Sequence, residues 1–141
     1  MALLVDATAL LAQADADEPL HAVVSSLLRE EREALVTSEF IAAEADYLIL
    51  KRLGVDAELA FVDDLANGTY TVDCLTPTEL RAARDVIARH RDLRLGIADA
   101  SLVVLADRYS TRRILTFDQR AFRTVQPLQG GAFTILPADA T

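Results

Sequence analysis

One segment of the chain, residues 95–122, constrains the fold more than any other. Its middle, residues 98–106, is almost entirely apolar and carries one carboxylate, Asp99, near its start. A short β-like stretch at residues 113–116 follows, and Asp118 comes two residues after it. Burying an ionised carboxylate costs several kcal/mol unless another group compensates the charge. The segment therefore predicts a buried helix and a buried strand whose acids need a compensating partner.

Short apolar runs alternate with helical patterns along the rest of the chain. The pattern predicts strands at residues 3–5, 34–36, 70–75, 113–116 and 133–136, and helices at residues 8–14, 19–31, 39–53, 56–67, 77–90 and 98–106. The strands are short and apolar on both faces, which is typical of a parallel sheet between two helical layers. We therefore expect an α/β fold: a single domain over residues 1–141, with a mainly parallel sheet of about five strands, helices on both faces and a tail that frays after about residue 137.

The composition narrows the class of protein. A chain of 141 residues has the length of one domain, and a hydrophobic content of 52% argues against disorder. No apolar run approaches the length of a membrane span, and the N-terminus lacks the basic region of a signal peptide. Cys74 is the only cysteine, which fits a reducing, cytoplasmic setting, and it is expected to be a small buried hydrophobe.

The charges are distributed unevenly. The net charge of −8 argues against a nucleic-acid-binding protein. However, residues 1–80 hold 4 Lys or Arg against 16 Asp or Glu, whereas residues 81–123 hold 10 Arg against 5 Asp. The chain therefore has an acidic half and an arginine-rich half, which are either solvated helix faces or surfaces for partners of opposite charge.

Three aspartates stand where a parallel sheet of this kind places its ligands, outside the carboxyl ends of its strands. Asp6 follows the first predicted strand, Asp118 follows the fourth, and Asp99 opens the apolar helix before that strand. A fourth acid, Glu44, lies on or beside the apolar stripe of the helix predicted at residues 39–53. Thr8 and Thr116 flank these acids and could position a water molecule or a carboxylate.

Acids that converge on one cleft raise each other's pKa unless a cation is present. The sequence has no Cys/His cluster of the kind that binds zinc, and hard oxygen ligands favour Mg²⁺ or Mn²⁺. Each acid also has a structural alternative: an Asp after a strand is commonly a turn residue or a helix cap, and Glu44 could pair with an arginine. We predict a divalent-metal site, with structural roles for the acids as the alternative.

The same residues resemble the motifs of a known family, the PIN domains. Leu4-Val-Asp-Ala-Thr-Ala-Leu10 is similar to their opening strand and turn, with Thr8 at a position that is more often Ser. Ala43-Glu44 with Tyr47-Leu48 resembles their second acidic motif, Gly96-Ile-Ala-Asp-Ala100 the third, and Leu115-Thr-Phe-Asp118 with Phe122 the fourth. The resemblance spans residues 3 to about 137, and the compact length is similar to that of VapC-type toxins from bacterial toxin–antitoxin pairs.

This resemblance implies a metal-dependent endoribonuclease that acts as a homodimer and is inhibited by an antitoxin covering its site. It further implies that Asp6, Glu44, Asp99 and Asp118 hold Mg²⁺ or Mn²⁺, the last of them directly or through water. Within the arginine-rich half, the side chains around Asp118 could contact RNA phosphates or pair with acids of the other half; they are Arg108, Arg112, Arg113, Arg120 and Arg123. The acidic half could receive a basic antitoxin segment.

Three other functions remain open at this level. A PIN-type nuclease could process RNA as a housekeeping enzyme, or the fold could be a non-catalytic interaction module with structural acids. A phosphotransfer domain also carries an aspartate after its first strand. The only lysine, Lys51, lies away from the predicted acids in sequence, and no second Asp stands two residues from Asp6, so phosphotransfer is disfavoured.

Overall fold

Five short strands form one parallel sheet in the computed structural model, which describes residues 1–140. The strands are β1 (Leu3–Val5), β2 (Leu35–Ser38), β3 (Thr71–Asp73), β4 (Arg113–Leu115) and β5 (Thr134–Leu136). Their order is β3-β2-β1-β4-β5, and every neighbouring pair is parallel. The prediction of an α/β fold with about five mainly parallel strands is therefore confirmed, and β1 is the central strand.

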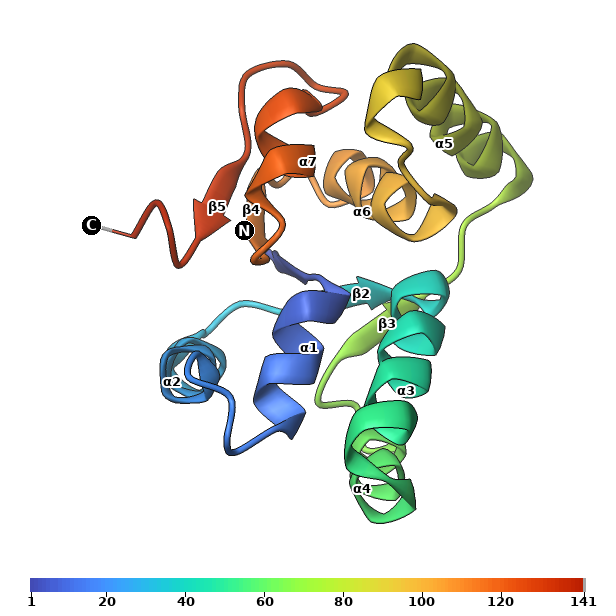
Figure 1. The fold of residues 1–141 in the computed structure, drawn as a ribbon. Coiled ribbons are helices and arrows are strands. Elements are labelled where there is room, and N and C mark those ends of the chain that lie inside the picture. The colour runs from blue at the N-terminus through green and yellow to red at the C-terminus, as the bar shows by residue number, and fades with distance from the viewer. Residues whose placement is uncertain (141) are drawn as a thin grey trace.

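Helices cover both faces of the sheet. They are α1 (Ala7–Ala14), α2 (His21–Glu30), α3 (Glu39–Leu53), α4 (Val55–Ala66), α5 (Pro77–Arg89), α6 (Ile97–Arg108) and α7 (Gln119–Thr124), with a 3₁₀ turn, η1 (Arg91–Leu93), before α6. Figure 1 shows α1 to α4 on one side of the strands and α5 to α7 on the other. Among the described residues, no helix is long and apolar enough to cross a membrane.

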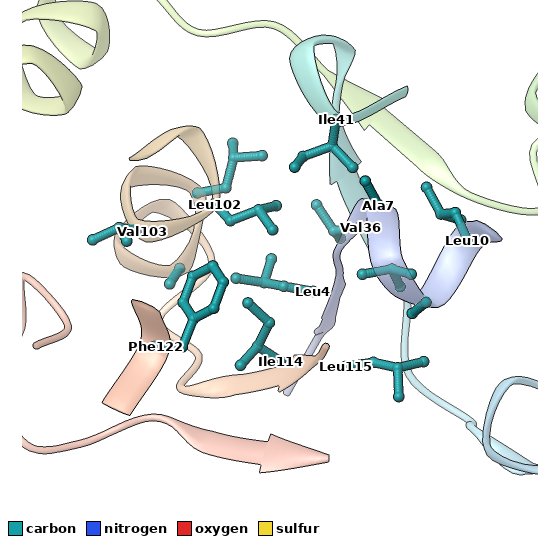
Figure 2. Packing of buried hydrophobic residues seen from close by; sticks show 14 of the residues in the cluster. Leu4, Ala7, Leu10, Val36, Ile41, Leu102, Val103, Ile114, Leu115 and Phe122 are labelled. Atoms are coloured by element: carbon teal, nitrogen blue, oxygen red, sulfur yellow. The ribbon is translucent and has the colours of Figure 1, made fainter. Parts of the chain in front are cut away.

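The core lies on both faces of the central strands. Leu4 and Ile114 point toward α6, and Leu115 points to the opposite face, on the side of α1 (Figure 2), as the alternation of a β-strand requires. Every residue of β1 is buried, and so are the seven residues of α6 from Ala100 to Ala106. The apolar run at residues 98–106 is thus a buried helix, as predicted from the sequence.

Local sequence signals set the boundaries of the helices. Thr76 and Glu79 form a capping box at the start of α5, with Pro77 in the first helical position. The hydroxyl of Ser38 accepts a hydrogen bond from the amide of Ile41 at 3.1 Å and caps α3. The cap of α3 matters for function because α3 carries Glu44, and the N-terminus of α3 fixes where that side chain lies.

Several local expectations differ from the structure. The six-residue helix α7 was not predicted, and Pro19 lies before α2 rather than in its first turn. Cys74 is exposed rather than buried, because it follows the edge strand β3. Asp139, within the tail that was expected to fray, pairs with Arg123 at 2.5 Å.

Candidate active site

The four predicted acids come from four different elements and line one pocket. Asp6 follows β1 and caps α1, Asp118 caps α7, and Asp99 lies in the first turn of α6. Glu44 lies in the second turn of α3. Three of these carboxylates therefore stand at helix N-termini, where the positive end of the helix dipole favours a negative charge.

Asp6 is the most constrained of the four acids, with only 2% of its surface exposed. Its Oδ1 accepts a hydrogen bond from the amide of Ala7 at 2.8 Å, and its Oδ2 accepts from the hydroxyls of Thr116 at 2.6 Å and Thr8 at 3.2 Å. A carboxylate oxygen has two lone pairs, so Oδ2 is fully used and Oδ1 keeps one free. Burial raises the pKa of Asp6, and the hydrogen bonds from Thr116, Ala7 and Thr8 oppose that shift.

The two predicted threonines connect β1 to the segment after β4. The hydroxyl oxygen of Thr116 accepts a hydrogen bond from the amide of Asp118 at 3.0 Å, and that of Thr8 accepts from the amide of Phe117, also at 3.0 Å. The carboxylate of Asp118 in turn accepts from the amide of Ala121 at 3.3 Å, inside α7. One hydrogen-bonded network therefore orients both Asp6 and Asp118.

The four acids place several carboxylates close together in the pocket. Burial raises the pKa of Asp99 to about 7, with further contributions from Asp6, Asp118 and Glu44. Burial also raises the pKa of Glu44, helped by the charge of Asp6. Within residues 1–140, none of the four acids forms a salt bridge. Such a set of carboxylates is more stable with a bound cation than without one.

A buried pair of serines, which the sequence reasoning missed, fixes the spacing of two of the acids. The hydroxyl oxygens of Ser38 and Ser101 lie 2.6 Å apart, and that of Ser101 donates to the carbonyl of Ala98 at 2.5 Å. This contact joins the start of α3, which carries Glu44, to the first turn of α6, which carries Asp99. The available signal was that Ser101 is the only hydroxyl residue within the apolar run at 98–106.

The pocket also has a wall that the sequence reasoning did not identify. It adds the side chains of Leu11, Glu18, Leu20, Leu48, Arg52 and Phe117 to the four acids and Thr8. These residues come from α1, the connection between α1 and α2, α3, and the segment after β4. Individually they look like ordinary helix or loop residues, so only the tertiary arrangement brings them together.

The chemistry of the donor set fits Mg²⁺ or Mn²⁺, since it consists of carboxylate oxygens with threonine hydroxyls nearby. Within residues 1–140, no three His, Cys, Asp or Glu side chains are close enough together to hold an ion entirely by themselves. Mg²⁺ commonly keeps several of its waters and binds through one or two carboxylates plus substrate phosphates. The residues therefore fit a hydrated ion rather than one enclosed by protein ligands.

Most arginines around Asp118, which could contact RNA or pair with acids of the other half, have partners within the protein. Arg108 pairs with Glu79 and Asp73, Arg113 with Glu31, and Arg123 with Asp139, while Arg112 donates to the carbonyls of Gly130 and Gln129. Among the described residues, Arg120 is the only one of the five with neither a side-chain salt bridge nor a side-chain hydrogen bond. The alternative interpretation, pairing with acids of the acidic half, therefore applies to Arg108 and Arg113, whereas the partner of Arg123 lies outside that half.

The sequence of the chain is similar to those of known proteins. The family model for the PIN domain matches residues 3–126. Ribonuclease VapC26 of Mycobacterium tuberculosis is 47% identical over 135 residues, which cover 96% of this chain and 100% of that protein. The sequence match therefore includes every element that contributes an acid to the pocket.

Two solved structures share the fold at lower sequence identity. VapC20 of Mycobacterium tuberculosis, a toxin that cleaves the sarcin–ricin loop, superposes with a TM-score of 0.77 at 19% identity, covering 83% of this chain and 90% of that one. A chain of VapBC2 from Rickettsia felis, solved with a DNA fragment of its promoter, superposes with a TM-score of 0.67 at 11% identity, covering 91% and 96%. At these identities the likeness concerns the fold alone.

Proposed function

Because this chain belongs to the PIN-domain family, and within it to the VapC-type toxins, we propose that it is a divalent-metal-dependent endoribonuclease that a cognate antitoxin neutralises. The reaction is hydrolysis of a phosphodiester bond in RNA. The 47% identity to a ribonuclease over nearly the whole chain supports the activity and its class of substrate.

One observation carries the metal dependence of this proposal. Four carboxylates line one pocket, and within residues 1–140 none of them has a salt-bridge partner. A non-catalytic module with structural acids would be expected to pair them, as it pairs Glu79 with Arg108 elsewhere in the same chain. The unpaired set instead favours a site that is completed by Mg²⁺ or Mn²⁺ and an RNA phosphate.

Each residue of the pocket has a distinct task in this proposal. A bound divalent cation would supply an activated water molecule and neutralise charge on the phosphodiester. Asp6 offers the free lone pair of Oδ1, because Thr8 and Thr116 hold its Oδ2. Asp99 and Glu44 add carboxylates from α6 and α3, and Asp118 binds the ion directly or through water. The apolar neighbours of these acids, among them Leu48 and Phe117, limit access of bulk water.

A protein partner is supported by the surface next to the pocket. Large apolar side chains are exposed along α2, α3 and α4; they include Leu20, Val23, Phe40, Tyr47, Val55, Leu59 and Val62. Tyr47, Val55 and Leu59 are each more than half exposed. Contiguous exposed apolar surface commonly marks a protein interface. We therefore place the antitoxin and a second copy of the chain on this side of the molecule as a proposal.

The proposed function is tested with purified protein and RNA. Cleavage is expected in Mn²⁺ or Mg²⁺, with loss of activity in EDTA and recovery when excess Mn²⁺ is returned. Expression of the chain alone should arrest growth, and co-expression of the small protein encoded beside it should restore growth. RNA cleavage without growth arrest would instead favour a housekeeping nuclease, and cleavage that persists in EDTA would contradict a metal-dependent site.

Replacing Thr116 with Val should lower RNA cleavage by about 10-fold to 100-fold, the usual effect of removing a group that orients a metal ligand. The substitution removes both the hydrogen bond to Asp6 and the acceptor for the amide of Asp118. Thr116→Ser, which keeps the hydroxyl, should retain most of the activity. Initial cleavage rates at saturating Mn²⁺ measure the effect.

Thr37→Val is the matched control for this prediction. Thr37, in β2, is also a buried threonine, but its hydroxyl donates to the carbonyl of Val5 at 2.9 Å and to none of the four acids. This variant should lose stability and keep its cleavage rate per folded molecule. Equal losses of activity in Thr37→Val and Thr116→Val would show that the role of Thr116 is only structural.

A further inference from the structure

The catalytic pocket extends beyond the acids along one face of α3. Glu44, Leu48 and Arg52 follow one another at intervals of four residues, so they share a face of the helix, and all three line the pocket. Glu44 and Arg52 are separated by about 12 Å along the helix axis. The pocket therefore has an acidic end, an apolar middle and a guanidinium group at its far end.

Arg52 has no acidic partner among the described residues, although five carboxylates line the same pocket. Within residues 1–140 its side chain forms no salt bridge or hydrogen bond, whereas Arg108, Arg113 and Arg123 are all paired. Glu18 and Glu44 are the pocket's carboxylates outside the aspartate cluster, and neither of them engages it. Arg52 is also exposed and is the only basic side chain that lines this pocket. A free guanidinium at the end of a substrate pocket is available to bind an anion.

We propose that Arg52 binds a phosphate of the RNA strand next to the phosphate that is cleaved, which makes Arg52 a substrate-positioning residue. This inference rests on the proposed ribonuclease activity. RNA is a chain of evenly spaced phosphates, so a strand that presents one phosphate to the acids carries another along the pocket. Arg52 is the one group there with the charge to receive it, and its planar fork suits a phosphate.

The apolar middle of the pocket suits the nucleoside between the two phosphates. Leu48 lies on α3 between Glu44 and Arg52, Leu11 and Phe117 also line the pocket, and Phe117 is half-buried. Aromatic and apolar side chains bind bases of single-stranded nucleic acid by stacking, and this contact tolerates many sequences. The acidic end, the apolar middle and the basic end thus match two successive phosphates with the nucleoside that joins them.

The test measures binding of a fluorescein-labelled pool of random single-stranded RNA 12-mers by fluorescence anisotropy. All proteins carry Asp99→Asn, so that the RNA stays intact, and KCl is varied in the presence of Mg²⁺. Adding Arg52→Gln should weaken binding about tenfold, because a charge-assisted hydrogen bond is lost. The slope of log affinity against log salt should also become shallower by about 0.7, the value for one phosphate contact on a single strand.

Two further variants separate a phosphate contact from a general charge effect. Arg52→Lys keeps the charge and should restore most of the affinity. Lys51→Gln removes the neighbouring positive charge on the same helix, but the Lys51 ammonium lies 5.7 Å from the centre of the Tyr47 ring and does not line the pocket. Lys51→Gln should leave affinity and salt slope unchanged.

Other results would overturn the inference. Unchanged RNA affinity and slope in Arg52→Gln would refute it, provided that the protein with Asp99 intact cuts RNA. An equal loss in Lys51→Gln would show that only the net charge matters. If Arg52→Gln weakened binding of the antitoxin and not of RNA, the residue would belong to a protein interface. Failure of the parent protein to bind or cut RNA would overturn the proposed function together with this inference.

Discussion

Asp99→Asn is expected to reduce RNA cleavage about 1000-fold and, at the same time, to raise the stability of the metal-free protein. A metal ion contributes several kcal/mol to transition-state stabilisation, and each 1.36 kcal/mol corresponds to a factor of ten in rate. The gain in stability has a separate cause. Burial and the charges of Asp6, Asp118 and Glu44 all raise the pKa of Asp99, so an uncharged amide is better tolerated there.

Asp107→Asn provides the control on the same helix. Asp107 lies two turns after Asp99 in α6, is exposed and does not line the pocket. This variant should cut RNA at the parent rate and melt at the parent temperature. Cleavage at the parent rate by Asp99→Asn would remove that residue from the site, and loss of both activity and stability would make its role structural.

The second large effect is the dependence of stability on pH and metal. In the metal-free protein, the pKa of Asp99 is about 7, against 3.8 for the free side chain, so the folded state keeps a proton that the unfolded chain has released. Stability therefore falls as pH rises from about 4 to about 7, the interval between the two pKa values. Roughly 2 kcal/mol is expected from Asp99 once solvent screening of a half-buried group is allowed for.

Mn²⁺ should reverse this loss at pH 7.5. A ligand at one hundred times its dissociation constant stabilises the folded state by about 2.7 kcal/mol, or about 8 °C for a chain of this size. Urea unfolding followed at several pH values, with and without Mn²⁺, measures both effects. In Asp99→Asn the free energy of unfolding should fall less steeply with pH. Stability that is flat from pH 5 to 7.5 and insensitive to Mn²⁺ would contradict the proposed cluster of unpaired acids.

At lower pH the stability of the folded protein should rise, rather than fall, as pH rises. Arg108 lowers the pKa of Glu79 to about 2, and Arg123 lowers that of Asp139 to about 2. These ion pairs stabilise the folded protein above the ordinary pKa of a carboxylate and are lost as pH falls toward 2. The metal-free protein should therefore be most stable at about pH 4.5, where the two ranges meet.

The acids of the site could be predicted because each stands at a position that local sequence reveals. Asp6 and Asp118 follow short apolar runs, Asp99 begins a buried one, and Glu44 interrupts the stripe of an amphipathic helix. In a parallel sheet the carboxyl ends of the strands meet at one edge, so these local positions already imply a shared site. In the structure, all four acids line one pocket, as these local positions imply.

Other features depend on contacts between distant segments and could not be predicted. Arg108 pairs with Glu79 29 residues away, and Arg113 with Glu31 82 residues away, so neither pair leaves a local pattern. The helix α7 is only six residues long, too short for a clear period, although Asp118 as a cap was a usable signal. Arg52 looks like a solvated residue at the end of a helix until the fold places it in the pocket.

The hydrogen bond between Thr116 and Asp6 joins residues 110 positions apart, in a chain of 141. A growing polypeptide on the ribosome therefore carries its first acid early but cannot orient it until β4 has emerged and paired with β1. For a protein whose proposed target is RNA, this order has a practical meaning. The ribosome that makes the protein, its messenger and the tRNAs bound there are exposed to a complete cutting site only after β4 and Thr116 have been made.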